Sequence, residues 1–397
     1  MKNFKQVPIT ILTGYLGAGK TTLMNHVLTN QQGYKVAVIV NDIGEVNIDA
    51  KLISDEGFIQ EEDKGNVVPL SNGCICCTLK ADLMQQIVDI LKTQKFDYIL
   101  IEASGICEPL PIAQTITTLS NSMEQYGLPK ICRLDNVVTV VDAMRLVTEF
   151  GCGENLVKED IEEEDIENLL IQQIEFCNVI VLNKVDDVTK EQLNEVKAVI
   201  KSLQPTAKII ETNYAKVDVK EIMDTNNFDF EDIQTSAGWI KELEKEEEEA
   251  DEDHDEHNEH DHDHDGHHHH HEEGEAEEYG ISTFVYTSRK PLDEKKFEDF
   301  VNDRFPSSVI RCKGLVWFAN DYDMSYLFEQ AGKQMQLSQT GYWLASAPKD
   351  ELKEMIAQDP EILKDWDREV GDRMVKLVFI GRKMDKEAII KEMENCH

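Results

Sequence analysis

The sequence has few basic residues and no long apolar run. Its 397 residues include 78 acidic and 40 basic side chains, which gives a formal net charge of −38 at pH 7. Such a charge disfavours nucleic acid and anionic membranes as partners, and no apolar run reaches the length that crosses a bilayer. We therefore expect neither nucleic acid nor membrane as a partner, and cations are the more natural ligands.

Cysteine is also scarce, with nine residues in the chain, three of them in one short motif. A disulfide-rich secreted scaffold would contain more of them. Residues 1–10 lack the basic start and the long apolar segment of a secretory signal. These features predict a cytoplasmic protein that uses its thiols in chemistry rather than in a disulfide framework.

Strand-like and helix-like segments alternate in the first half of the chain. This alternation is typical of an α/β domain in which helices flank a mostly parallel sheet. The expected strands are residues 7–13, 35–40, 98–101, 136–141, 179–182 and 208–211. The expected helices are residues 20–29, 80–93, 111–119, 164–175 and 190–202. Residues 52–70 are irregular, and we interpret them as a loop or a small hairpin.

A low-complexity block follows this first half. Residues 244–278 contain nineteen acidic residues, one lysine and ten of the 12 histidines, and they cannot bury a core because they are almost free of apolar residues. Beyond the block, we expect strands at residues 281–286, 314–318 and 376–380 and helices at residues 294–302 and 386–393. The predicted organisation is a domain over residues 1–240, a disordered acidic, His-rich linker over 241–279 and a smaller α+β domain over 280–397.

The motif GYLGAGKTT, residues 14–22, lies between the first expected strand and the first expected helix. Its glycines let the backbone curl around phosphate oxygens, and the helix N-terminus adds positive potential. Lys20 would contact the β- and γ-phosphates, and the Thr21 hydroxyl would ligate Mg²⁺. The motif predicts a P-loop NTPase domain. The residues expected to bind the nucleotide here are Gly14, Gly17, Ala18, Gly19, Lys20, Thr21 and Thr22.

A second motif, NKVD at residues 183–186, follows another apolar strand and favours GTP over ATP. The Asp186 carboxylate can accept both N–H groups on one edge of guanine. Adenine would leave this carboxylate unpaired, at a cost of about 1–3 kcal/mol. Asn183 can bond the N7/O6 edge of the base, and the Lys184 stem can pack along it.

Acidic residues follow two further strands. Glu102 could hold Mg²⁺ through water or orient the attacking water, and the amide of Gly105 could contact the γ-phosphate; the alternative for Glu102 is a helix cap. In residues 41–49, Asp42 could act on Mg²⁺ or on the nucleophilic water, although a plain acidic loop explains this segment nearly as well. Asp142 ends another strand, and the sequence assigns it no role.

The motif GCICC, residues 73–77, groups the thiols of Cys74, Cys76 and Cys77. Such a site suits Zn²⁺, Cu(I) or Co²⁺, and a fourth ligand would be a carboxylate such as Glu45, a histidine or water. Inert buried cysteines or a redox pair are the alternatives. The His-rich block would collect Zn²⁺, Ni²⁺ or Co²⁺ without fixed geometry, unless it is merely a solvating linker.

Together, GYLGAGKTT, NDIGEVNID, GCICC, IEASG and NKVD resemble the CobW-type metallochaperone GTPases, relatives of the GTPases that insert nickel into urease and hydrogenase. The resemblance covers the first half of the chain closely and residues 282–381 more loosely. It departs at Asp42, where the family more often has Glu. The resemblance implies a nucleotide-binding domain, a CobW C-terminal domain, GTP hydrolysis, and a metal site that includes Cys74, Cys76 and Cys77.

These observations lead us to expect a GTPase that binds GTP, GDP and Mg²⁺ and that transfers a divalent metal to a client metalloprotein. Zinc is the expected metal, with Co²⁺ or Ni²⁺ as possible alternatives, and a homodimer is possible. A regulatory GTPase switch with structural cysteines is a second hypothesis. Passive zinc storage by the His-rich block is a third.

Overall fold

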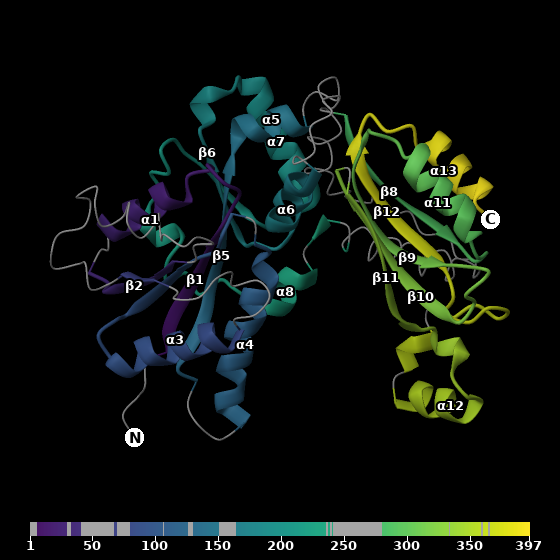
Figure 1. Cartoon of the computed structure of the whole chain (residues 1–397), viewed down its shortest axis with the longest axis horizontal. Coiled ribbons are helices and arrows are strands. Elements are labelled where there is room, and N and C mark those ends of the chain that lie inside the picture. The colour runs from purple at the N-terminus through teal and green to yellow at the C-terminus, as the bar shows by residue number, and fades with distance from the viewer. Residues whose placement is uncertain are drawn as a thin grey trace, which may run out of the picture. The chain divides into compact units, whose positions relative to one another are not determined.

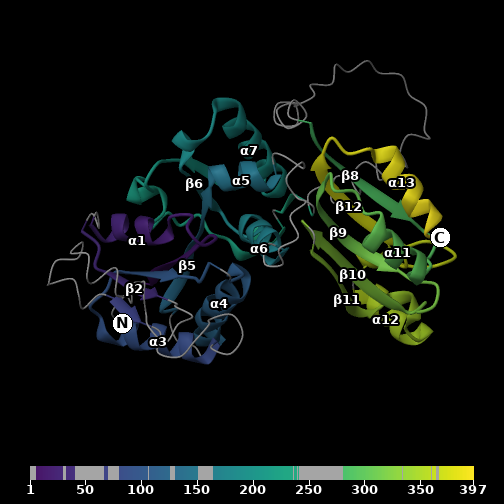
Figure 2. The same cartoon turned by 45° about the horizontal axis from the view of Figure 1, so that its top comes forward.

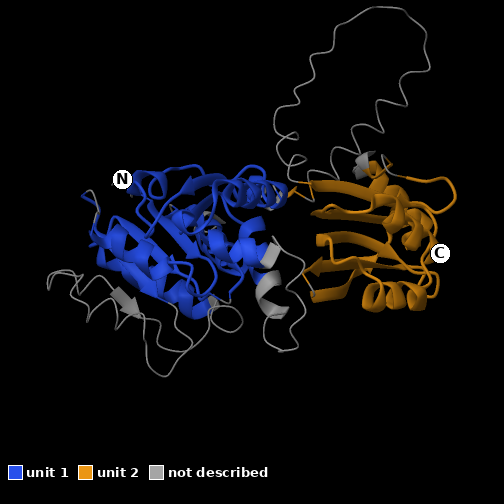
Figure 3. Cartoon of the chain, turned by 90° about the horizontal axis from the view of Figure 1, so that it is seen from above, with its two compact units in different colours: residues 1–162, 169–237 blue, residues 163–168, 238–397 orange. Residues whose placement is uncertain are grey.

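The computed structural model places the chain in two compact units (Figures 1 and 2). Residues 1–162 and 169–237 form the first unit, and residues 163–168 and 238–397 form the second (Figure 3). The described residues are 6–29, 33–40, 67–69, 80–105, 107–125, 130–150, 164–235, 237–238, 240, 280–332, 334–358, 360–363 and 366–397. The expected linker, residues 241–279, lies outside them, and the expected domain boundaries stay a prediction.

A seven-stranded sheet is the centre of the first unit. Its strand order is β3-β2-β4-β1-β5-β6-β7, and every neighbouring pair is parallel. The inner strands are continuous apolar runs because both faces of the sheet are covered. The strands are β1 (Val7–Thr13), β2 (Val36–Val40), β3 (Val67–Pro69), β4 (Tyr98–Glu102), β5 (Cys132–Asp142), β6 (Val179–Asn183) and β7 (Lys208–Glu211).

Helices cover both faces of this sheet. α1 (Lys20–Thr29) and the segment after β7 pack on one face, where Leu12, Val38 and Val140 belong to the same buried cluster. α3 (Lys80–Thr93) and α4 (Pro109–Gln125) lie on the other face (Figures 1 and 2). The remaining helices are α5 (Ala143–Phe150), α6 (Glu164–Glu175), α7 (Lys190–Leu203) and α8 (Phe230–Thr235). The prediction of a P-loop-type α/β fold with a parallel sheet is confirmed.

Two details of the first unit differ from the expectation. Most of the irregular stretch at residues 52–70, interpreted as a loop or a small hairpin, lies outside the described residues. Within it, residues 67–69 form β3, which pairs in parallel with β2 and was not expected as a strand of the main sheet. β5 begins at Cys132, four residues before its expected start. The sequence pattern missed this start because the first residues of β5 carry polar side chains and do not form an apolar run.

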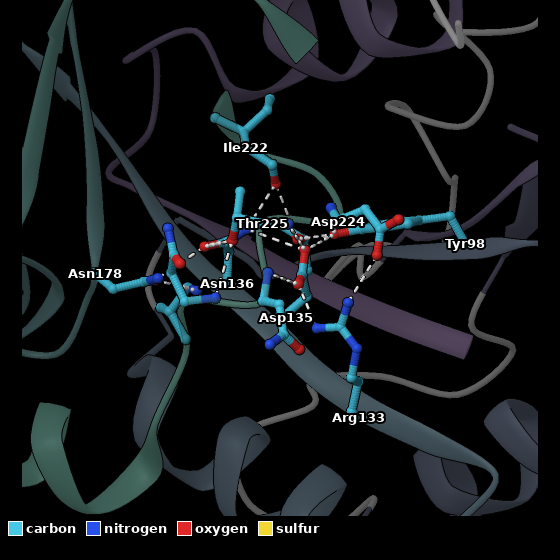
Figure 4. A network of polar contacts seen from close by, with 12 residues as sticks. Tyr98, Arg133, Asp135, Asn136, Asn178, Ile222, Asp224 and Thr225 are labelled. Atoms are coloured by element: carbon cyan, nitrogen blue, oxygen red, sulfur yellow. Dashed lines mark hydrogen bonds and ion pairs between the residues drawn. The ribbon is translucent and has the colours of Figure 1, made fainter. Parts of the chain in front are cut away.

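Those polar side chains form a buried network at the amino end of the sheet (Figure 4). The carboxylate of Asp135 is fully buried; it is paired with Arg133 and accepts a hydrogen bond from the Tyr98 hydroxyl at 2.6 Å. The same carboxylate accepts the backbone amides of Thr225 at 3.1 Å and Asn226 at 2.8 Å. Burial and the Asp135 charge raise the pKa of Tyr98 well above its usual value. The network thus joins β4 and β5 to the segment after β7.

Replacing Asp135 by Ala should destabilise the protein by about 3–5 kcal/mol, because a buried ion pair loses one partner and two backbone amides lose their acceptor. Urea unfolding of the nucleotide-free chain, followed by circular dichroism, measures the change. Asp89→Ala is the control, since Asp89 pairs with Lys92 on an exposed helix surface. Equal midpoints for the two variants would show that the Asp135 network contributes nothing to stability.

The second unit contains a five-stranded antiparallel sheet in the order β11-β10-β9-β12-β8. Its strands are β8 (Ile281–Ser288), β9 (Val309–Trp317), β10 (Met324–Ala331), β11 (Gln334–Tyr342) and β12 (Val375–Arg382). α11 (Glu294–Asp303) and α13 (Lys386–Asn395) contribute Phe297, Phe300 and Met393 to the buried cluster under this sheet. α12 (Lys349–Gln358) completes the regular elements. The α+β prediction is confirmed, although β10, β11 and α12 were not expected.

Across the described parts of both units, no helix is long and apolar enough to cross a membrane.

Candidate nucleotide-binding site

The P-loop follows β1 and packs against its neighbour β5. At Gly14, φ is 133°, and an added Cβ would lie 2.2 Å from the backbone oxygen of Val140. At Gly19, φ is 113°, and a Cβ would lie 2.5 Å from the Asn183 side-chain nitrogen. No other residue fits these two positions, because a side chain would clash with the strand or with the amide and would be strained at these φ values. The glycines therefore let the loop lie close to both β5 and β6.

Lys20 and Thr21 begin α1 beneath this loop. Lys20 is 8% exposed, and its ammonium group donates to the backbone oxygen of Tyr15 at 3.2 Å. The Thr21 hydroxyl donates to the Glu102 carboxylate at 3.4 Å. Glu102 is at the carboxyl end of β4, where it lies opposite Leu12 of β1. A hydroxyl and a carboxylate beside a phosphate loop are the kind of oxygen ligands that Mg²⁺ takes in such sites, so these two residues fit the expected ion.

The segment after β4 also touches the P-loop. A Cβ on Gly105 would lie 2.8 Å from the backbone nitrogen of Leu16. The Gly105 carbonyl accepts a hydrogen bond from the Gln173 side chain at 3.2 Å, which ties this segment to α6. Glycine at position 105 thus lets this segment lie close to the P-loop, and the γ-phosphate contact of its amide stays a prediction.

Asn183 connects the P-loop to the base-binding motif. Its side-chain nitrogen donates to the backbone oxygen of Ala18 at 2.9 Å, and its side-chain oxygen accepts the backbone amide of Ala215 at 3.0 Å. Asp186 is exposed, and its backbone amide donates to the Asn213 side chain at 3.1 Å. Because the Asp186 carboxylate is exposed, it is accessible to the guanine N–H donors that it is expected to bind.

Lys184 has a partner that the sequence did not indicate. It adopts a left-handed backbone conformation with φ of 59°, and its ammonium group lies 2.5 Å from the Asp142 carboxylate. Asp142, which had no assigned role, ends β5 next to the motif because β5 and β6 are paired there. Asn213, Ala215 and Asp142 were missed as parts of this site; only Asp142 gave a signal, as an acidic residue at a strand end.

The expected zinc-site residues and one expected catalytic residue cannot be placed in the site. Asp42, Glu45, Cys74, Cys76 and Cys77 lie outside the described residues. Within the described part of the chain, no group of three or more His, Cys, Asp or Glu side chains is arranged to hold a metal ion. Thr22, the last residue of the P-loop motif, is described and exposed.

Three of the described cysteines outside the motif are buried thiols. Burial raises the pKa of Cys132 and of Cys177 to about 12, and it raises the pKa of Cys312 still further. Zinc binds the thiolate, so a raised pKa disfavours metal binding by these three thiols. Cys107 is disulfide-bonded, whereas the sequence predicted thiols used in chemistry rather than a disulfide framework.

Cys132, Cys177 and Cys312 should resist iodoacetamide at pH 8 in the folded protein, because a raised pKa leaves almost no thiolate and burial blocks access. Peptide mass spectrometry after native labelling measures this. The same three thiols should react fully once urea unfolds the chain, which serves as the internal control. Native labelling at the unfolded rate would contradict the burial of these sites.

The edge of the sheet therefore brings a phosphate loop, an acidic strand end and a guanine motif together, which defines a P-loop nucleotide-binding protein. The family described as "CobW/HypB/UreG, nucleotide-binding domain" matches residues 8–211, and "Cobalamin synthesis protein cobW C-terminal domain" matches residues 281–397. The chain belongs to the CobW/HypB/UreG family and is a GTPase of that family.

Similar proteins include the zinc-regulated GTPase metalloprotein activator 1 of Dictyostelium discoideum, which is 37% identical over 100% of this chain and 81% of the relative. Zinc chaperone CobW of Pseudomonas aeruginosa is 32% identical, over 57% of this chain and 62% of its own length. A crystal structure of Zn(II)-bound YjiA GTPase from E. coli aligns over 99% of both chains with a TM-score of 0.41 and 20% identity. The predicted membership of the CobW-type family is confirmed.

Proposed function

We propose that this chain is a GTP-driven metallochaperone that binds zinc through Cys74, Cys76 and Cys77 and transfers it to a client metalloprotein. GTP hydrolysis is supported by the contact between the Thr21 hydroxyl and the Glu102 carboxylate beside the P-loop. This contact brings together the two groups expected to hold Mg²⁺. The zinc half is supported by the thiol motif and by relatives that are named as a zinc chaperone and a zinc-regulated activator.

The residues have separate tasks in GTP hydrolysis. Lys20 supplies positive charge to the β- and γ-phosphate oxygens, and the P-loop amides bind the same phosphates. Thr21 and Glu102 would hold Mg²⁺, which offsets charge on the transferred phosphoryl group. Glu102 or Asp42 orients the attacking water. Asn183, Lys184 and Asp186 bind the guanine base and fix the substrate relative to these groups.

Zinc is the cargo of this reaction, and its release is tied to the nucleotide. Residues 41–49 follow β2 and include Glu45, which we propose as a ligand that completes the thiol site when GTP is bound. Hydrolysis would withdraw this ligand and weaken the zinc site. We place the protein in the cytoplasm, because the three thiols of this motif would remain reduced there.

Lys20→Ala should nearly abolish GTP hydrolysis, because no other described side chain of the P-loop offers a cation to the β/γ-oxygens. The variant should still bind zinc at the thiol motif. GTP turnover and zinc stoichiometry are measured on the same preparation, with circular dichroism to confirm the fold. If a folded variant loses both activities, the thiol site is not separable from the nucleotide site.

Asp186→Asn should change the base preference from guanine to xanthine, since the C2 oxygen of xanthine can accept from the new amide. Binding titrations with GTP, ATP and XTP provide the test. Glu221→Gln is a matched control, because Glu221 pairs with Lys208 at 3.1 Å on the surface, away from the motif. An unchanged preference for GTP in Asp186→Asn would show that this carboxylate does not read the base.

Passive zinc storage is a second candidate function, favoured by the ten histidines of residues 244–278. A store would lose all zinc binding when this block is deleted. A metallochaperone would retain the tight thiol site. Titration of zinc into the full chain, the deletion variant and the Cys76→Ser/Cys77→Ser variant separates the two functions.

A further inference from the structure

The first turn of α5 lies between the two halves of the nucleotide site. Asp142 ends β5, and α5 begins at the next residue. One oxygen of the Asp142 carboxylate lies 2.5 Å from the Lys184 ammonium group, and the other accepts the backbone amide of Arg145 at 3.2 Å. The Asp142 side chain is 15% exposed and that of Lys184 is 38% exposed. Asp142 therefore contacts the base motif on one side and its own helix on the other.

Arg145 extends from this turn to the P-loop. Its guanidinium group lies 3.9 Å from the centroid of the Tyr15 ring, which is the geometry of a cation–π contact. It also donates to the backbone oxygen of Leu16 at 3.5 Å. Tyr15 is 8% exposed, whereas Leu16 is 56% exposed. The contact thus holds the first residues of the loop, immediately before Gly17, from the side of β5.

We propose that Asp142 and Arg145 are positioning residues for GTP. Asp142 orients the Lys184 side chain so that its stem packs along the base. Arg145 holds the backbone of Tyr15 and Leu16 in the conformation that binds phosphate. Asp142 immediately precedes α5 and Arg145 lies in its first turn, so this strand–helix junction links the base side of the site to the phosphate side. Preorganised groups of this kind lower the ordering cost of binding.

The inference rests on the proposed GTP site, and it predicts effects that the proposed site alone does not. A Lys184 stem packs against any purine, so weakening its support should affect GTP and ITP equally. The carboxylate of Asp186, by contrast, determines the choice between bases. The Tyr15 ring acts on the loop, so its loss should affect triphosphate binding whatever the base.

The test measures the Kd of GTP and ITP and the kcat and KM of GTP hydrolysis in the full chain. Asp142→Asn keeps an oxygen for the Arg145 amide but removes the charge opposite Lys184. It should raise both dissociation constants about fivefold, raise KM and leave kcat within about twofold. Arg145→Met should have an effect of the same size. Tyr15→Phe, which keeps the ring, should bind like the parent, and Tyr15→Leu should bind like Arg145→Met.

Double variants separate positioning from a general loss of stability. Asp142→Asn should have no further effect on Kd in a Lys184→Met chain, because it acts through Lys184. Arg145→Met should have a smaller effect in a Tyr15→Leu chain than in the parent chain, because the ring contact is already lost and only the hydrogen bond to Leu16 remains. Glu221→Gln, which breaks a more exposed surface ion pair between the same kinds of charged group, is the control. Additive effects in both double variants, or an Asp142→Asn chain that binds GTP like Glu221→Gln, would overturn the inference.

The Lys20→Ala variant distinguishes a failure of the positioning role from a failure of the proposed GTP site. If Lys20→Ala disrupts phosphate binding while Asp142→Asn and Arg145→Met have no effect, the GTP site stands and the positioning role falls. If Lys20→Ala leaves GTP binding and hydrolysis intact, the nucleotide lies elsewhere and both proposals fail.

Discussion

The side-chain amide of Asn183 is the contact on which the nucleotide site depends. Its nitrogen binds the P-loop at Ala18, and its oxygen binds the loop after β7 at Ala215. Asn183 is 3% exposed, and only glycine at position 19 leaves room for its nitrogen. Both ends of this buried amide form hydrogen bonds, and the loss of either bond would leave a buried polar group unpaired at a cost in free energy. One side chain therefore joins the phosphate side of the site to the base side.

Much of the fold could be predicted because parallel strands covered on both faces read as apolar runs. β1 and β7 have their expected bounds, as do α1, α3 and α6. The missed strands are of a different kind. β11 reads QMQLSQTGY and is largely exposed at the edge of its sheet, so neither an apolar run nor a clear alternation marks it. The start of β9 was missed because Arg311 and Lys313 interrupt its apolar residues.

The site could be predicted where the local sequence of a motif determines its conformation. The strand–loop–helix context placed Lys20 and Thr21, and strand ends placed Glu102 and Asn183 at one edge. The approach of Thr21 to Glu102 is consistent with their expected shared ion. Contacts between distant segments were not predictable: Arg145 reaches Tyr15 across 130 positions of sequence, and its residue type gives no sign of this. Sequence pattern identifies the strands, but the sheet order decides which residues meet.

We propose that nucleotide state controls zinc affinity, and a competition titration tests this coupling directly. Zinc is titrated against a chromophoric chelator without nucleotide, with GDP and with a non-hydrolysable GTP analogue, in the full chain and in a chain that lacks residues 244–278. The GTP analogue should tighten zinc binding relative to GDP by about 5–150-fold, and zinc should tighten binding of the analogue by the same factor. Equal zinc affinity in all three states would contradict it.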